Sequence, residues 1–251
     1  MNYIIITGAS KGLGEGLALE LLHESHHLIC ISRSKSEKLE KLAAAKNCPI
    51  TFISFDFAMT HDVPDLARLV FEHIPLDQAS GVYLINNAGV INPVGRTENC
   101  PADEVEQHMR INLISPMLLT AAFIKYTNGW KMEKRVINIS SGAAKNPYYG
   151  WSSYCTGKAG IDMFTQCVGA EQQDLDYPVE IMAVAPGIID TEMQTTIRGT
   201  TEEQFIHRQK FVELKESGQL VPPQLAGKRL AKLLFSDEFS NGGIIDIRDS
   251  Y

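Results

Sequence analysis

The sequence predicts an α/β fold, a doubly wound parallel sheet with helices on both faces. Short apolar runs alternate with helical patterns along the 251 residues, which is the order that βαβ units produce. The first runs are apolar at almost every position, as expected of strands buried on both faces of a parallel sheet. Because no linker interrupts the alternation, we expect a single domain over residues 1–251.

Seven apolar runs are interpreted as strands and six periodic segments as helices. Continuous apolarity indicates strands at residues 3–7, 28–32, 50–55, 82–85, 136–139, 179–184 and 243–247. Apolar residues three and four apart indicate helices, the first through Leu17, Leu21 and Leu22, the others at 37–46, 63–74, 104 to about 127, 152 to about 175, and 222–235. Residues 192–218 are polar with weaker periodicity. They either form a lid over the strand ends or a surface helix pair.

A glycine-rich turn joins the first strand to the first helix. Gly8, Gly12 and Gly14 have the spacing G-x-x-x-G-x-G. Glycines at this place let the backbone approach a pyrophosphate, and the helix N-terminus supplies N–H donors and positive potential. The turn could be only a tight connection, but its position favours a dinucleotide site.

The end of the second strand predicts which cofactor is used. In dinucleotide folds an acidic residue there binds the ribose 2′-hydroxyl, whereas an Arg accommodates a 2′-phosphate. Arg33 follows the strand at once, and no Asp or Glu occurs before Glu37. Lys11 in the glycine turn adds a second positive charge. Two cations and no carboxylate predict NADPH, with ordinary solvated side chains as the alternative.

Tyr154 and Lys158 lie one helical turn apart, so both occupy one face of their helix. Ser141 stands at the end of the preceding strand and faces the start of that helix. A phenol beside an ammonium is suited to donate a proton to a carbonyl, because a nearby positive charge favours the phenolate. The Y-x-x-x-K pattern alone also fits an ordinary amphipathic helix, so its surroundings decide.

Three aromatic residues, Tyr148, Tyr149 and Trp151, lie between Ser141 and Tyr154. They could stack on phenyl rings of a substrate. They could equally pack at the start of the helix. The sequence leaves both interpretations open.

Pro116 lies inside the predicted long helix, four residues after Asn112. Proline has no N–H to donate to the carbonyl of Asn112. We therefore expect a kink at Asn112, caused either by this missing bond alone or by a water that replaces it.

Composition argues against several kinds of partner. A net charge of −7 argues against nucleic acid and acidic membranes. The five cysteines have no C-x-x-C spacing and the histidines no metal-ligand spacing, so we expect neither a disulfide framework nor a metal site. No apolar run reaches about 18 residues, and the chain opens on a strand pattern rather than a charged leader. We expect a cytoplasmic protein.

Taken together, the motifs resemble those of the short-chain dehydrogenase/reductase family. They follow the family's order along the chain: Thr7-Gly8-x-x-x-Gly12-x-Gly14, Asn86-Asn87-Ala88-Gly89, Asn112, Ser141, Tyr154-x-x-x-Lys158 and Pro186-Gly187. The resemblance implies a Rossmann-type sheet of about seven strands and a nicotinamide cofactor. It implies that the cofactor is bound by Gly8, Ser10, Lys11, Gly12, Leu13, Gly14, Arg33, Ser34, Asp56, Asn87, Ala88, Gly89, Tyr154, Lys158, Pro186, Gly187, Ile189, Thr191 and Met193.

The resemblance also implies a catalytic tetrad. Tyr154 would be the acid, Ser141 would orient the carbonyl, and Lys158 would lower the pKa of Tyr154 and bind the ribose. Asn112 would hold a water that relays protons to Lys158. The implied partners are a small-molecule carbonyl substrate and further copies of the chain. We expect a homodimer or homotetramer that buries apolar residues such as Met117, Leu118, Met163 and Phe164.

Within the family, the sequence resembles sepiapterin reductases and the bacterial benzil reductases that form (S)-benzoin. This resemblance rests on Gly150-Trp151-x-x-Tyr154-Cys155-x-Gly157-Lys158-Ala159, Asp190-Thr191-x-Met193-Gln194 and residues 134–147. It implies an NADPH-dependent reductase of aromatic α-dicarbonyls that binds substrate through Ser141, Tyr148, Trp151, Tyr154 and Asp246. Asp246 stands where sepiapterin reductases anchor the pterin. The alternatives are a true sepiapterin reductase and a non-catalytic NADPH-binding regulator, and the intact tetrad argues against the regulator.

Overall fold

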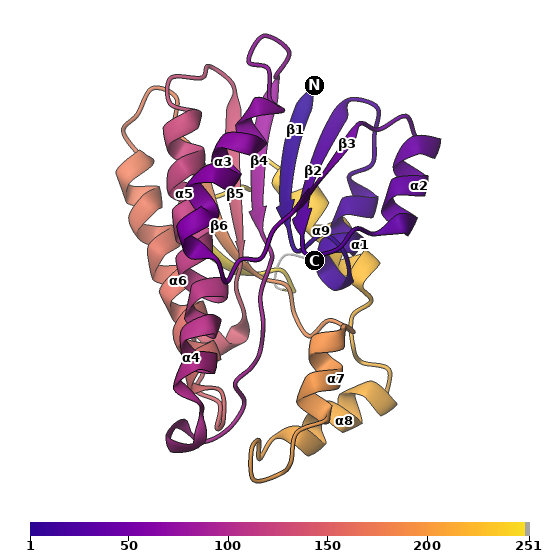
Figure 1. Ribbon diagram of the computed structural model, residues 1–251, viewed down its shortest axis with the longest axis vertical. Helices are drawn as coiled ribbons and strands as arrows, with labels where there is room; N and C mark the ends of the chain where they lie inside the picture. The colour runs from indigo at the N-terminus through magenta and orange to yellow at the C-terminus, as the bar shows by residue number, and fades with distance from the viewer. Residues whose placement is uncertain (249–251) are drawn as a thin grey trace.

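The computed structural model describes residues 1–248 and contains one seven-stranded parallel sheet. The strands lie in the order β3-β2-β1-β4-β5-β6-β7 (Figure 1). Their bounds are β1 Asn2–Thr7, β2 His26–Ser32, β3 Ile50–Ser54, β4 Gly81–Asn86, β5 Glu133–Ile139, β6 Glu180–Ala185 and β7 Gly243–Asp246. The predicted Rossmann-type α/β fold is therefore confirmed, and residues 249–251 of the predicted domain lie outside the described residues.

Helices cover both faces of the sheet. On one face lie α1 (Gly12–Glu20), α2 (Glu37–Ala45) and α9 (Pro223–Leu234), and on the other α3 (Val63–Glu72), α5 (Ser115–Tyr126) and α6 (Ser152–Gln172) (Figure 1). Alternate strand residues face the two layers. Ile4 and Ile6 pack with the first layer, whereas Ile5 packs with the second. Burial on both faces explains why the strands are apolar at almost every position.

The predicted helix at residues 104–127 is interrupted. It consists of α4 (Ala102–Met109), a π-helical turn (Arg110–Ile114) and α5. The Ser115 N–H donates to the carbonyl of Arg110, so the bond spans five residues instead of four. Asn112 lies in this π turn, and Pro116 follows it. At the position of the predicted kink the chain thus forms a π-helical turn, just before the proline.

The topological switch point lies between β1 and β4. From β1 the sheet extends through β2 to β3 on one side and through β4 to β7 on the other. In open α/β sheets, ligands bind in the crevice outside the carboxyl ends of the strands at this point. The loops after β1, β4, β5 and β6 open there, and they carry the glycine turn, Asn87, Ser141 and Pro186.

Two further helices, α7 (Glu192–Arg198) and α8 (Arg208–Glu216), form from the polar segment 192–218. In Figure 1 they lie beyond the carboxyl ends of the strands, apart from both helical layers. They pack on each other. The segment 192–218 therefore lies where a lid over the strand ends would lie, and it is called the lid below. Within residues 1–248, none of the helices combines the length and apolarity needed to span a bilayer.

Candidate active site

The glycine turn is tight because neighbouring backbone and side-chain atoms leave no room for larger residues at its glycines. Gly8 and Gly12 have φ angles of 68° and 59°, in the left-handed region that favours glycine. A Cβ on Gly14 would lie 2.2 Å from the carbonyl oxygen of Gly8, inside any allowed contact. A Cβ on Gly12 would lie 3.1 Å from the Thr191 methyl. The turn thus requires glycine and leaves its backbone accessible to a ligand.

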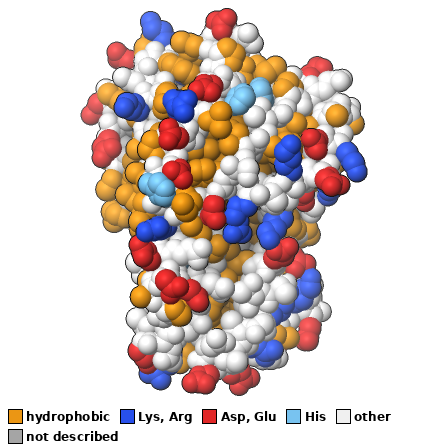
Figure 2. All heavy atoms as spheres, in the orientation of Figure 1, with side chains coloured by type: hydrophobic (Ala, Val, Ile, Leu, Met, Phe, Trp, Pro, Cys, Tyr) orange, Lys and Arg blue, Asp and Glu red, His pale blue; other side chains and the backbone are white. Residues whose placement is uncertain are grey.

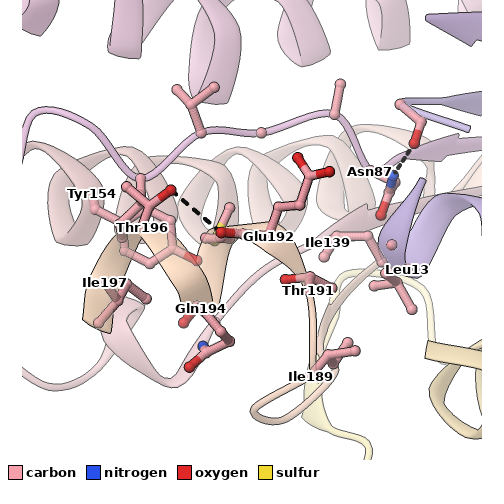
Figure 3. A pocket seen from close by; sticks show the side chains of 18 of the residues that line it. Leu13, Asn87, Ile139, Tyr154, Ile189, Thr191, Glu192, Gln194, Thr196 and Ile197 are labelled. Atoms are coloured by element: carbon pink, nitrogen blue, oxygen red, sulfur yellow. Dashed lines mark hydrogen bonds between the residues drawn. The ribbon is translucent and has the colours of Figure 1, made fainter. Parts of the chain in front are cut away.

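A cavity of about 1320 Å³ runs along the carboxyl ends of the strands. In Figure 3, Leu13 and Asn87 lie at one end, Tyr154 lies at the other, and Thr191 and Glu192 lie between them. Its wall contains nearly all of the predicted site residues: Gly8, Ser10, Lys11, Gly12, Leu13, Arg33, Ser34, Asp56, Asn87, Ala88, Gly89, Ser141, Tyr148, Trp151, Tyr154, Lys158, Pro186, Gly187, Ile189, Thr191, Met193 and Asp246. Gly14 and Asn112 lie behind this wall and shape it from there.

Hydrogen bonds join the end of β1 to the loop after β4 in the wall of the cavity. The Thr7 hydroxyl accepts from the backbone N–H groups of Asn87 and Ala88, at 2.9 and 3.0 Å. The Asn87 amide donates to the carbonyls of Thr7 and Gly8, at 2.8 and 3.2 Å. These bonds fix the loop after β4 against the glycine turn, which explains the side-chain amide at this strand end.

The two cations expected to select the cofactor occupy different environments. Arg33 is exposed directly after β2 and lines the cavity. The Lys11 ammonium forms an ion pair with Glu192 at the start of α7, with side chains 64% and 73% exposed. Exposed ion pairs contribute only about 0–1 kcal/mol. Lys11 can therefore exchange this carboxylate for another anion at little cost.

Ser141, Tyr154 and Lys158 converge at one end of the cavity. Ser141 and Tyr154 both line the cavity, and Tyr154 lies in the first turns of α6. Lys158 is buried, and its Nζ donates to the carbonyl of Ile139 at 2.7 Å. The same Nζ lies 5.8 Å from the centroid of the Tyr154 ring. The structure brings these three predicted catalytic residues together.

Burial is the main influence on the pKa values of these residues. It raises the pKa of Tyr154 above its ordinary value, and the Ser141 side chain only partly offsets this. Burial also lowers the pKa of Lys158 to about 8, while Asp162 acts in the opposite direction. Burial has the largest effect on the pKa of Tyr154. That Lys158 lowers this pKa stays a prediction.

Asn112 is held by the backbone of the loop after β4. Its Oδ1 accepts from the Val90 N–H at 2.8 Å, and its Nδ2 donates to the Val90 carbonyl at 2.7 Å. A Cβ on Gly89 would lie 3.1 Å from Asn112 Oδ1 and 3.9 Å from Lys158 Nζ. Gly89 thus keeps space open between these two residues.

The aromatic residues before Tyr154 connect the site to the lid. Trp151 is buried and stacks on Phe205, with ring centroids 4.6 Å apart and planes at 6°. Its ring also packs against Tyr154 at 5.5 Å and Tyr148 at 5.0 Å. Tyr149 is exposed. One face of Trp151 is therefore used in packing, while Tyr148 and Trp151 still border the cavity.

Asp246 lines the cavity as an ion pair. Its Oδ1 accepts from Arg248 Nε at 2.8 Å and from the Arg248 N–H at 3.0 Å, and its Oδ2 accepts from Nη2 at 2.5 Å. The Arg248 guanidinium holds the pKa of this carboxyl below its ordinary value. A ligand cation at Asp246 would have to share the carboxylate with Arg248.

Sequence reasoning missed His108, which is fully buried in the cavity wall. Its Nε2 lies 2.8 Å from Asn112 Nδ2. The sequence contains one indication of this contact, because His108 lies one helical turn before Asn112 and so shares its helix face. Ile197 and Phe211 of the lid also line the cavity, but weak periodicity gave no indication of which lid residues face inward.

Comparison with known proteins identifies the family. Residues 2–202 match the family model described as short chain dehydrogenase. A benzil reductase ((S)-benzoin forming) from Bacillus cereus is 46% identical over 98% of this chain and 99% of its own length. A sepiapterin reductase from Meriones unguiculatus is 32% identical over 98% of this chain and 96% of its own. The crystal structure of the KRED1-Pglu enzyme superimposes with a TM-score of 0.83 at 26% identity, covering 98% of this chain and all of that one.

The family match spans most of the chain, and the curated relatives cover almost all of it. The cavity at the switch point, the glycine turn and the Ser141, Tyr154 and Lys158 cluster lie within the matched region. The predicted resemblance to benzil and sepiapterin reductases is thereby confirmed. The chain belongs to the short-chain dehydrogenase family of oxidoreductases.

Proposed function

We propose that the protein is an NADPH-dependent carbonyl reductase that reduces one carbonyl of an aromatic α-dicarbonyl, as in the conversion of benzil to benzoin. The observation that carries this proposal is the convergence of Ser141 and Tyr154 in the wall of a glycine-lined cavity, with buried Lys158 beside Tyr154. The 46% identity to a benzil reductase supports the substrate class. The reductase domain would span residues 1–251.

The residues present fit a dinucleotide. The glycine cradle admits no Cβ at Gly14, and such turns bind pyrophosphate through backbone N–H groups. Arg33 and Lys11 would hold the 2′-phosphate, and both line the cavity without an acidic residue at the end of β2. When bound, NADPH would supply the hydride that reduces the carbonyl carbon.

The protein's own chemistry is proton donation. The raised pKa of Tyr154 keeps its phenol protonated near neutral pH, so that it can give a proton to the carbonyl oxygen. The Ser141 hydroxyl, in the same cavity wall, would orient the same oxygen. Lys158 and Asn112 would complete the tetrad, Lys158 at the ribose and Asn112 through the proton-relay water.

Apolar and aromatic groups on the substrate side favour a substrate with phenyl rings. Ile91, Trp151, Ile197 and Phe211 belong to one buried cluster that also contains Tyr154, and Tyr148 packs against it. Offset or edge-to-face ring contacts add about 0.5–1.5 kcal/mol each beyond burial. Tyr148 and Trp151 would thus form the substrate wall, with Trp151 held in place by Phe205.

A second candidate is sepiapterin reduction, which Asp246 in the cavity and the 32% identity to a sepiapterin reductase favour. The ion pair with Arg248 argues against it, because the N–H donors of a pterin would compete with a guanidinium for the carboxylate. A non-catalytic regulator would have no use for a buried phenol in one cavity wall with Ser141 and Lys158.

The deciding experiment is a substrate panel. NADPH oxidation would be followed with benzil, sepiapterin and simple ketones, and each product identified by chiral chromatography. We expect benzil to give the highest kcat/KM and benzoin as product. A higher kcat/KM for sepiapterin would favour the second candidate, and NADPH binding without turnover of any carbonyl would favour the regulator.

We further propose that the protein is a homodimer or homotetramer. Ile114, Met117, Leu118 and Met163 are exposed on the π turn, α5 and α6, whereas Phe164 is partly buried. Figure 2 shows hydrophobic side chains gathered on the flank where α5 and α6 lie. A monomeric mass by light scattering at micromolar concentration would contradict this. All five cysteines are free thiols, which supports a cytoplasmic location.

A further inference from the structure

His108 occupies the last turn of α4 and is fully buried between the Asn112 turn and α6. Its ring packs edge-on against Tyr154, with centroids 6.1 Å apart and planes at 79°. A Cβ on Gly157 would lie 3.5 Å from His108 Nε2 and 3.5 Å from Asn112 Cβ. Gly157 therefore lets α6 approach closely enough for the imidazole to reach both Asn112 and Tyr154.

The hydrogen bonds of His108 admit one tautomer. Nδ1 lies 2.6 Å from the carbonyl oxygen of Asn92, which can only accept, so Nδ1 must carry the proton. Nε2 lies 2.8 Å from Asn112 Nδ2, which can only donate, so Nε2 must be unprotonated. The orientation of the Asn112 amide is fixed independently, because its Oδ1 accepts from the Val90 N–H.

The bonds form a closed chain. Asn112 uses one N–H for the Val90 carbonyl and the other for His108, and His108 returns to the same loop at Asn92. Val90, Ile91 and Asn92 all line the cavity. The imidazole thus ties the Asn112 turn to the stretch of cavity wall that faces Tyr154.

We propose that His108 is a positioning residue, which as a neutral Nδ1–H imidazole fixes the Asn112 carboxamide and the wall at residues 90–92 beside Tyr154. The inference rests on the proposed function, because it assigns His108 a part in that reaction. It predicts a dependence on pH that packing alone would not produce.

Protonation would break this arrangement. A proton on Nε2 would place an N–H donor against the Asn112 NH₂ at 2.8 Å. The titratable groups that the structure places against the ring are Tyr154 and Lys158 of α6. Burial lowers the pKa of His108, the bond to Asn92 acts against this, and the Lys158 ammonium lowers the pKa further. The ring therefore stays neutral at pH 7, and activity declines only as pH falls through this lowered pKa.

Three variants separate the contacts. The amide of Gln reaches the position of Nε2, so His108→Gln can still accept from Asn112. The shorter Asn reaches the position of Nδ1, so His108→Asn keeps the contact to Asn92 instead. His108→Leu keeps a side chain of similar size and loses both hydrogen bonds. His27→Gln is the matched control, because His27 also has a pKa lowered by burial but contacts Thr51 near the opposite end of the sheet.

We expect His108→Leu and His108→Asn to lower kcat at least about tenfold, with the Kd for NADPH measured by fluorescence within about twofold. His108→Gln should recover most of the wild-type kcat and lack the acid limb of the pH–rate profile. His27→Gln should keep both the wild-type kcat and the acid limb of the pH–rate profile. An unchanged acid limb in His108→Gln, or recovery by Asn as good as by Gln, would overturn the proposal.

A second readout needs no substrate. In the full-length wild-type protein, imidazole ¹⁵N NMR should show His108 as the Nδ1–H tautomer, titrating below its ordinary pKa of about 6.5. An Nε2–H tautomer would overturn the proposal even if His108→Leu fails to fold. If the protein reduces none of the carbonyls, the proposed function fails, and the NMR result still decides whether the hydrogen-bond chain exists.

Discussion

Lys158 donates at 2.7 Å to the carbonyl of Ile139, the last residue of β5, which lies two residues before Ser141. This bond ties α6 to the end of β5 and so holds Tyr154 opposite Ser141. It also leaves the ammonium over the Tyr154 ring, with Nζ 5.8 Å from the ring centroid. The spacing of Tyr154 and Lys158 on one helix face therefore serves first to position the phenol.

The first prediction concerns the proton donor. Tyr154→Phe removes the hydroxyl and little volume, so we expect kcat to fall about 10²- to 10⁴-fold, the usual cost of losing a general acid. NADPH binding, followed by fluorescence, should persist. Retention of more than half the activity would refute the role of Tyr154.

The second prediction concerns Lys158, whose pKa is lowered from 10.5 to about 8. Between these values the unfolded chain binds more protons than the folded one, so this group contributes increasing stability as pH rises from 8 to 10.5. At pH 7 the buried ammonium is therefore a cost. We expect Lys158→Met to unfold at an equal or higher temperature than wild type at pH 7 while losing turnover. A lower Tm at that pH would show that the bond to Ile139 outweighs the burial of the charge.

The third prediction tests the choice of cofactor. Wild type should prefer NADPH over NADH at least about tenfold in kcat/KM, or about 1.4 kcal/mol. Arg33→Asp should shift the preference toward NADH, because a carboxylate there repels a 2′-phosphate and accepts from a 2′-hydroxyl. Equal use of both cofactors by wild type would contradict the assignment.

The fourth prediction concerns the ion pair between Lys11 and Glu192. Glu192→Gln releases the ammonium, so we expect the Kd for NADPH to fall about two- to fivefold, in line with the small free energy of exposed pairs. Binding of NADH should not change. Glu72→Gln is the control, because Glu72 pairs with Arg68 on the outer surface of α3. Equal tightening of both cofactors would show that Lys11 does not contact the 2′-phosphate.

Strong local patterns made the fold predictable from the sequence. The seven apolar runs become the seven strands, with ends displaced by at most a few residues. The interruption of the long helix could not be predicted in detail, because the sequence shows only that Pro116 lacks an N–H. Whether the chain responds with a bend, a bound water or a π-helical turn depends on packing. The observed π turn brings Asn112 onto Val90, and the proton-relay water stays a prediction.

The site was predictable where a motif is local, and unpredictable where contacts cross the chain. The glycine turn and the Tyr154–Lys158 pair follow from spacing alone. The stack of Trp151 on Phe205 and the pairing of Asp246 with Arg248 depend on how the lid and the C-terminal segment fold back. The large effect of burial on the pKa of Tyr154 could not be predicted, since desolvation cannot be assessed from neighbours in sequence.

The most direct test of the proposed reaction is one experiment on wild type and Tyr154→Phe in parallel. NADPH consumption and benzoin formation would be measured from the same reaction with benzil. The proposal predicts one benzoin per NADPH for wild type, and NADPH binding without turnover for Tyr154→Phe. NADPH bound by wild type without any benzoin, or benzoin formed equally fast by Tyr154→Phe, would contradict it.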